Sequence, residues 1–217
     1  MNFDALLTML ACTADPARAA FMRAYMKNRF DFLGIAKPQL MRICKPFFKG
    51  AAQADVDWRF VKQCWANPHR ELQYCALEYL RVVQSKLTPQ DIPRLQQMIT
   101  TKSWWDTADF LDRIVGGITL RHPEVNAVLL DWSQSDNIWL RRVAIDHQLL
   151  RKEKTDTALL EQILRNNLGQ TEFFINKAIG WALRDYSKTH PDWVRRFIAD
   201  YWQGMSRLSL REAQKYL

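Results

Sequence analysis

Apolar residues recur every three or four positions over several stretches of the chain, which is the spacing of one face of a helix. The pattern predicts helices over residues 3–12, 16–33 and about 38–48, with Gly34 ending the second. The apolar face of the second helix is formed by Phe21, Met22, Tyr25, Met26 and Phe30. Glycine (7) and proline (8) are scarce among the 217 residues, which favours long helices over a turn-rich β fold.

Helix-start signals repeat along the rest of the chain at a constant interval of 34 residues. They stand at Asp55, Pro89, Pro123, Thr157 and Pro191. Proline in the first helical turn, after a residue that caps the helix, is a favourable N-terminus. His122 and His190 directly precede two of these prolines, so we interpret them as helix-entry residues and not as metal ligands.

A second helix follows each of the first four starts, and each of these helices contains an alanine that would let stacked helices approach closely. These alanines are Ala76, Ala108, Ala144 and Ala178. Helix pairs that repeat at this length predict an α-solenoid, in which each pair buries its face against its neighbours. The Trp, Leu-Gly, Tyr and Pro pattern of tetratricopeptide repeats is not recognisable. We therefore expect an all-α protein, a curved α-solenoid of HEAT-like repeats that forms a single domain over residues 1–217.

The charge balance is basic, with 31 Lys and Arg against 23 Asp and Glu, a net charge of +8 and a pI of about 9.5. A basic balance on a small domain suggests a polyanionic partner, of which nucleic acid is the usual one. No signal peptide and no long apolar run are visible, so we expect a soluble, cytoplasmic protein. We also expect it to be a monomer.

Several classes of chemistry have no support in the sequence. The four cysteines lack CxxC spacing, and we expect them to be reduced and mostly buried. The four histidines form no HExxH motif, so we expect no metal. No phosphate-binding glycine loop and no GxSxG elbow occur, which leaves nucleotide hydrolysis and a serine nucleophile without support. We expect no cofactor.

Residues 102–114 combine two adjacent tryptophans with three carboxylates in a segment that is predicted to be helical. Trp105 and Asp109 are four residues apart, so they share one helix face. A carboxylate beside an indole suits a surface that meets a cation, since both attract positive charge. In the alternative interpretation Trp104 is core, Trp105 is a half-exposed packing residue and Asp109 is a solvated helix charge.

Basic residues gather in or beside the second helices of the repeats, which would place them on one face of a solenoid. They are Lys102, Arg113, Arg141, Arg142, Arg151, Lys152, Lys154, Lys177, Arg184 and Lys188. A basic groove matches a nucleic-acid backbone, and each Lys or Arg that pairs with a phosphate releases a counterion. We expect about half of these residues to be ordinary solvated charges, and Arg142 and Arg184 to contact phosphate.

A groove that only binds phosphate has no use for Asp109, which would repel DNA. Cleavage of an N-glycosidic bond makes the sugar resemble an oxocarbenium ion, and a fixed anion aimed at that charge lowers the barrier. No general acid is evident among the histidines.

Four motifs resemble those of the AlkD-type DNA alkylation repair glycosylases, which are built of HEAT-like repeats. The motifs are AYMKNRFDFLGI at 24–35, TKSWWDTAD at 101–109, SDNIWLRR at 135–142 and FFINKAIGWALR at 173–184. The resemblance covers nearly the whole chain. It implies excision of cationic alkylated purines, chiefly N3-methyladenine and N7-methylguanine, from double-stranded DNA in base excision repair, without flipping of the base.

The resemblance also implies roles for individual residues. Asp109 takes the place of the catalytic aspartate of the Trp-Asp-x-x-Asp motif, and Trp105 that of the tryptophan that contacts the sugar. Arg142, Trp181 and Tyr25 belong to the lesion-contacting surface. The whole candidate site therefore has two sets of residues. Those for catalysis are Asp109, Trp105 and Trp181, and those for DNA binding are Arg142, Tyr25, Lys102, Arg141, Lys177 and Arg184.

Two other functions compete with a glycosylase, namely a non-catalytic HEAT-like DNA-binding scaffold and a protein–protein adaptor. The acidic and aromatic set favours the enzyme, and the basic groove disfavours the adaptor. Gly116 and Gly117 interrupt the helix that carries Asp109, where each glycine costs about 1 kcal/mol relative to alanine. We expect them to mark a bend or the end of that helix.

Overall fold

The computed structural model describes residues 1–217 and contains thirteen α-helices, short 3-10 turns and no β-strand. The all-α prediction is confirmed. The helices form two compact units, residues 1–87 and residues 88–217, which are described in turn. That the whole chain acts as a single domain stays a prediction. None of the helices is long and apolar enough to cross a membrane.

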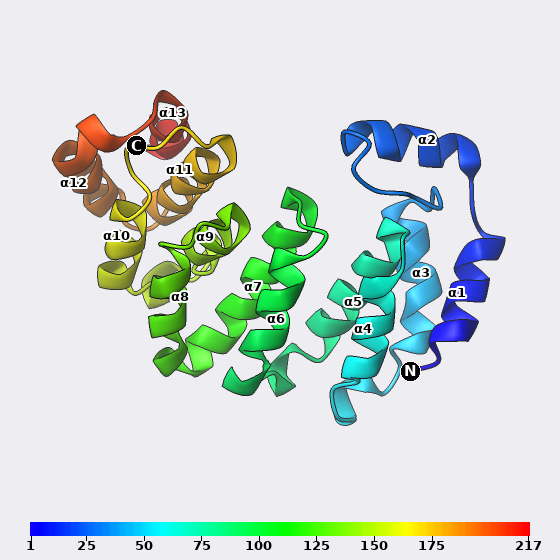
Figure 1. The fold of residues 1–217 in the computed structure, drawn as a ribbon. Coiled ribbons are helices and arrows are strands. Elements are labelled where there is room, and N and C mark those ends of the chain that lie inside the picture. Colours follow the sequence, from blue (N-terminus) through cyan, green and yellow to red (C-terminus); the bar gives the residue numbers. More distant parts are fainter. The chain divides into compact units, whose positions relative to one another are not determined.

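The first unit contains five α-helices, four of which form its core (Figure 1). Its helices are α1 (Phe3–Cys12), α2 (Pro16–Tyr25), α3 (Lys37–Phe47), α4 (Trp58–Ala66) and α5 (Arg70–Val82). Leu6 and Leu10 of α1 pack into the core with residues of α3, α4 and α5, whereas α2 buries no residue. The side chains of Asn2, Asp15 and Asp57 accept backbone N–H groups and thereby start α1, α2 and α4.

The prediction that the second helix continues to residue 33 is wrong, because α2 ends at Tyr25. Lys27 and Asn28 have φ angles of 57° and 56°, which a right-handed helix cannot include. The buried carboxylate of Glu71 then accepts the N–H groups of residues 33, 34 and 35 at 3.0, 2.8 and 3.1 Å. Gly34 lies where a Cβ would stand 2.0 Å from the Asp15 carbonyl oxygen, so this crossing needs glycine.

The second unit is a double layer of helices (Figure 1). One layer, which we call the site layer, consists of α7 (Trp105–Arg121), α9 (Ile138–Asp146), α11 (Phe173–Ser187) and α13 (Arg207–Ala213), each packed on the next. The other layer consists of α6 (Ile92–Thr100), α8 (Asn126–Trp132), α10 (Thr157–Arg165) and α12 (Pro191–Tyr201). Such alternation of paired helices is the arrangement of a helical-repeat protein, as predicted.

The 34-residue interval locates the starts of four helices of the second unit. Thr157 and Pro191 begin α10 and α12, while Pro89 and Pro123 begin 3-10 turns that lead directly into α6 and α8. The predicted start at Asp55 is wrong by three residues. The cap there is Asp57, whose carboxylate accepts the N–H of Phe60 at 2.9 Å.

Small residues allow close helix packing in the site layer, as the repeat pattern suggested. Ala108, Ala144 and Ala178 are all buried. The expectation that Gly116 and Gly117 end the helix is wrong, since α7 runs through both to Arg121. A Cβ on Gly116 would stand 2.1 Å from the carbonyl oxygen of His147, so glycine lets the end of α9 lie directly on α7.

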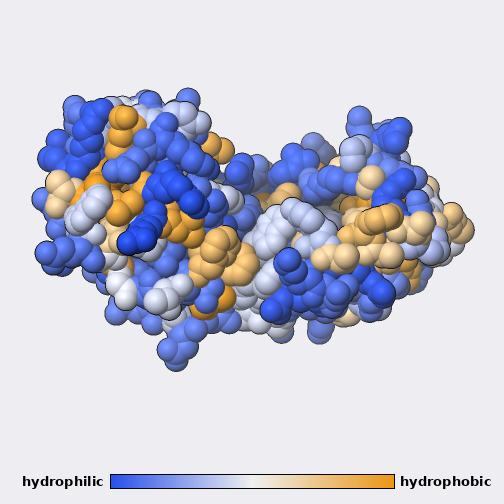
Figure 2. All heavy atoms as spheres, turned by 90° about the horizontal axis from the view of Figure 1, so that it is seen from above, coloured by the Kyte–Doolittle hydropathy of each residue, from blue (hydrophilic) through white to orange (hydrophobic).

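The surface of each unit is mostly hydrophilic on the face drawn in Figure 2, with smaller apolar patches between. The two most exposed large apolar side chains belong to α2 of the first unit, Phe21 at 78% and Tyr25 at 69%.

Three of the four cysteines, Cys44, Cys64 and Cys75, are buried and all four are free, as expected.

Candidate active site

An ion pair between neighbouring helices of the site layer fixes the carboxylate of Asp109. Arg142 of α9 donates from Nε to Oδ1 at 2.6 Å and from Nη2 to Oδ2 at 2.9 Å. Its Nη1 donates to the carbonyl oxygen of Phe174, the second residue of α11, at 2.6 Å. The Arg142 side chain is 2% exposed and that of Asp109 is 21% exposed. A buried, bidentate guanidinium therefore holds a carboxylate whose outer side remains open to solvent.

Two further carboxylates lie behind this pair, Asp112 of α7 and Asp146 of α9, and both are buried. An oxygen of Asp146 lies 3.8 Å from Nη2 of Arg142. Burial, together with the charges of Asp146 and Asp109, raises the pKa of Asp112 well above its usual range. Burial also raises the pKa of Asp146 to about 7, although Arg142 acts in the opposite direction.

Sequence reasoning missed these two buried carboxylates. Asp112 follows Asp109 by three residues and Asp146 follows Arg142 by four, so helical spacing alone places each beside its partner. That spacing is the signal that could have found them. Burial acts to lower the pKa of Arg142, but Asp146 and Asp109 raise it, so the guanidinium stays charged.

The ring of Trp181 of α11 lies against the guanidinium of Arg142. The Cζ atom of Arg142 lies 5.2 Å from the ring centroid, and the cationic groups of Lys177 and Arg184 each lie 5.8 Å from it. All three distances fall within the range of cation–π attraction. Trp105, the first residue of α7, is partly exposed and stands on the Asp109 face of that helix.

A cluster of three aromatic side chains supports the pair from the N-terminal ends of the helices. The ring centroids of Trp104, Trp139 and Phe174 lie 5.0 to 5.7 Å apart in tilted or edge-on contacts. Such contacts stabilise by about 0.5–1.5 kcal/mol each beyond the area that they bury. The carbonyl oxygen of Phe174 also accepts a hydrogen bond from Arg142. The cluster therefore fixes the positions of the N-terminal ends of α9 and α11 beside Asp109.

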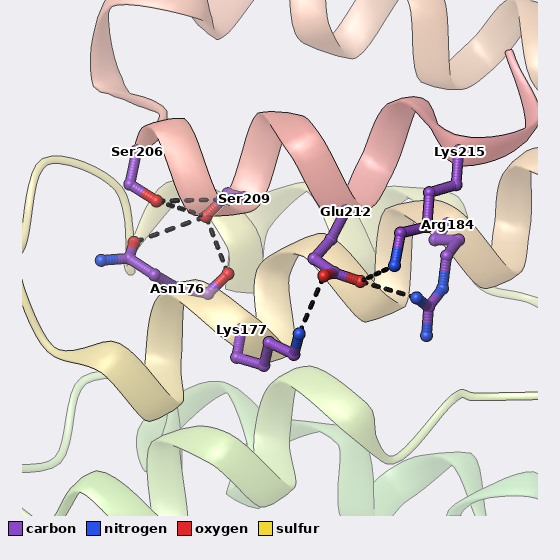
Figure 3. Close-up of polar contacts among 7 residues, drawn as sticks. All are labelled: Asn176, Lys177, Arg184, Ser206, Ser209, Glu212 and Lys215. Carbon is purple, nitrogen blue, oxygen red and sulfur yellow. Dashed lines mark hydrogen bonds and ion pairs between the residues drawn. The ribbon is translucent and has the colours of Figure 1, made fainter.

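Glu212 of α13 pairs with three basic side chains, Lys177 and Arg184 of α11 and Lys215 (Figure 3). Its carboxylate accepts from Lys177 at 2.8 Å, from Arg184 at 2.6 Å and from Lys215 at 3.0 Å. Gly180 makes this approach possible, because a Cβ there would stand 2.5 Å from Cβ of Glu212. Lys177 and Arg184 are thus held in fixed positions while about a quarter of each side chain remains exposed, 26% in both cases.

Replacing Glu212 by glutamine is expected to destabilise the protein at neutral pH by about 2 kcal/mol, the scale of a charged hydrogen bond. The hydrogen bond from Lys177 and, to a smaller extent, the one from Lys215 lower the pKa of Glu212 to about 2. A depressed pKa stabilises the fold above the unfolded value of about 4.3, and this contribution disappears as the pH falls through the folded value.

Chemical denaturation of both proteins between pH 2 and pH 7 measures this difference. The gap between Glu212→Gln and the native protein should close toward pH 2. The control is Glu153→Gln, which removes an exposed carboxylate of the same type. A constant gap at all pH values would mean that the charge of Glu212 does not matter to stability.

The remaining predicted site residues are placed as follows. Arg141 is half-buried and donates from Nε to the Asn167 side chain at 2.8 Å. Lys102 precedes α7 with a φ of 50° and is half-buried. Tyr25 is exposed at the end of α2 in the first unit. The second unit therefore brings together Asp109, Arg142, Trp181, Lys177 and Arg184. No group of three or more His, Cys, Asp or Glu side chains is arranged to hold a metal ion.

Paired helices in two layers, with an acidic, aromatic and basic cluster on one of them, define an all-α helical-repeat protein with a candidate active site. Comparison with known proteins gives its family. The family model described as DNA alkylation repair enzyme matches residues 6–217, so the chain belongs to the DNA alkylation repair enzyme family. No curated protein matches the chain.

Solved structures agree with this assignment. The chain is similar to a structure described as a predicted DNA alkylation repair enzyme from Enterococcus faecalis, with 32% identity, a TM-score of 0.87, and coverage of 94% of this chain and 96% of that one. AlkD2 from Streptococcus mutans shares the fold at 16% identity, with a TM-score of 0.61 and coverage of 83% and 98%. The protein smu.31 from Streptococcus mutans UA159 does so at 16%, with a TM-score of 0.60 and coverage of 82% and 97%.

Proposed function

We propose that this protein is a DNA N-glycosylase that releases N3-methyladenine and N7-methylguanine from double-stranded DNA. The observation that carries the proposal is the Asp109 carboxylate, which a buried arginine holds rigidly while its outer side faces solvent beside Trp181. A carboxylate that only solubilised the surface would need no bidentate buried partner.

The chemistry follows from the charge of the substrate. Alkylation at N3 or N7 leaves the purine with a positive charge, so the bond from C1′ to the base breaks with its electron pair moving to the purine. The base leaves neutral, and the positive charge passes to the sugar. Asp109 stabilises that charge and positions the water that then attacks C1′. The water leaves a hydroxyl on C1′ and releases its other proton to the solvent. Because the base leaves neutral, the site needs no general acid that donates a proton to the purine.

The surrounding residues fit a duplex whose base stays in the helix. Lys177 and Arg184 flank Trp181 and supply positive charge for backbone phosphates, in keeping with the net charge of +8. Trp105 and Trp181 offer flat faces to the deoxyribose. Acting on the sugar and backbone leaves the base stacked, so no extrusion of the nucleotide is needed.

A non-catalytic DNA-binding scaffold is the second candidate, and one observation favours it. Arg142 pairs with Asp109 through two hydrogen bonds, and a carboxylate neutralised in this way exerts a weaker pull on a cation. A scaffold would use the basic residues in the same way but would release no base.

Base release decides between the two candidates. Duplexes that contain N7-methylguanine, N3-methyladenine or uracil at one position are incubated with the protein, and the freed base is measured by chromatography. We expect release of both alkylpurines and none of uracil, whose neutral base needs protonation to leave. Binding to alkylated duplex without release would support the scaffold, and efficient uracil release would contradict the mechanism.

A further inference from the structure

The charge of the Asp109–Arg142 pair poses a problem for the proposed chemistry. One carboxylate and one guanidinium joined by two hydrogen bonds of 2.6 and 2.9 Å sum to zero. Seen from a sugar on the open side, the field of the near carboxylate is largely cancelled by the arginine just behind it. A site that stabilises a cation needs a further negative charge in or behind the pair.

Asp146 is placed to supply that charge. It is 1% exposed, and one of its oxygens lies 3.8 Å from Nη2 of Arg142. The same nitrogen donates a hydrogen bond to Asp109. Both of its carboxylate oxygens are buried without a hydrogen-bond partner, and so is Oδ1 of Asp112. Buried polar atoms are normally paired, so a buried carboxylate that makes no hydrogen bond to the protein costs stability and does not add to it.

We propose that Asp146 is a positioning residue for base excision: it shares the charge of Arg142 and thereby leaves Asp109 with a net negative field toward the sugar. The proposal rests on the proposed glycosylase function. Arg142 is the bridge between an outer carboxylate that faces the substrate and an inner one that never meets it. When both carboxylates are ionised, the group of three carries a charge of −1 instead of zero.

The charged groups that act on Asp146 are Arg142 on its own helix and Asp109, Asp112 and Arg113 on α7. Asp112 is buried as well, and burial together with the charges of Asp146 and Asp109 raises its pKa well above its usual range. His147, next in the chain, stays neutral because burial lowers its pKa to about 3. Asp146, whose pKa burial raises to about 7, is an inner group whose ionisation changes within the physiological range.

A pH dependence follows with a definite sign. Below about pH 7 Asp146 is protonated, Arg142 cancels Asp109, and excision is slow. Above that pH Asp146 is ionised and excision is fast. Stability changes in the opposite direction, because a folded-state pKa above the unfolded value of about 3.9 makes stability fall as the pH rises between the two.

The test compares Asp146→Asn with the native protein on duplex that contains N7-methylguanine. Single-turnover excision rates are measured from pH 5.5 to 8.5, together with DNA affinity and the thermal midpoint. The ratio of the two rates at each pH removes any titration of the substrate itself. We expect the variant to be about tenfold slower at pH 8, equal to the native protein at pH 5.5, unchanged in DNA affinity, and more heat-stable at pH 8.

Each outcome bears on the inference. A rate ratio that does not vary with pH overturns it, and so does a variant that loses heat stability together with activity, since that is the result of a purely structural role. Asp146→Ser provides a second uncharged side chain if the asparagine variant does not fold. A native protein that releases no alkylpurine refutes the proposed glycosylase and this inference with it. Native activity with a constant ratio refutes the inference alone.

Discussion

Replacing Asp109 by asparagine is expected to slow the release of N7-methylguanine by at least ~10²-fold, the effect of removing one electrostatic group from a transition state. Asparagine keeps the size of the side chain and can accept one hydrogen bond from Arg142. It lacks the charge that stabilises the sugar cation, and it leaves the positive guanidinium behind it uncompensated on that side. The rate is measured under single-turnover conditions on alkylated duplex.

The affinity for DNA provides the second measurement for this variant. Because a repulsive carboxylate leaves a surface that meets phosphates, binding should be retained or slightly tighter. Asp131→Asn is the matched control, since it removes an exposed carboxylate from α8 and should leave both the rate and the affinity unchanged. Full activity in Asp109→Asn would remove the basis of the proposed mechanism.

Replacing Arg142 by alanine is expected to destabilise the protein by about 3–5 kcal/mol, the cost of leaving buried charged partners unpaired. Three of its N–H groups donate to Asp109 and Phe174, and its charge also faces Asp146. For a chain of this length the thermal midpoint should fall by roughly 6–20 °C. Arg196→Ala removes an exposed arginine of α12 and should change the free energy of unfolding by less than about 0.5 kcal/mol.

This experiment also separates two roles of Arg142. The basic residues of the second helices predict a contact between this arginine and a DNA phosphate, and its side chain is 2% exposed in the structure. If the principal role is to hold Asp109, stability and excision should fall together. If Arg142→Ala instead weakens DNA binding, flattens its salt dependence by about one unit and leaves stability unchanged, the phosphate contact is the principal role.

Local signals in the sequence were sufficient to predict most of the helices. Proline and capping residues act within one helical turn, so Thr157 and Pro191 locate the starts of α10 and α12 without knowledge of the rest of the chain. The end of α2 depends instead on Glu71, which lies far along the sequence and binds residues 33–35. A local pattern cannot show such a contact, and the prediction of a helix to residue 33 failed for that reason.

The sequence predicted which residues form the candidate site better than it predicted how their side chains pair. Spacing along α7 placed Trp105 and Asp109 on one face, and the equivalence of repeats placed Arg142 and Trp181 near them. Nothing in the local sequence distinguishes an arginine that reaches solvent from one that turns inward. The pairing of Arg142 with Asp109 depends on how α7 and α9 pack, as does the burial of Asp146.

Arg142 connects three helices by hydrogen bonds, and this affects how the second unit unfolds locally. In a stack of helix pairs, each pair touches only its neighbours, so the array can unravel one repeat at a time. Arg142 of α9 is bonded to α7 on one side and to α11 on the other. Local opening of any one of these helices breaks this connection. Native-state hydrogen exchange should therefore show the backbone amides of all three helices becoming unprotected as one cooperative unit, while those of α12 exchange through smaller, separate fluctuations.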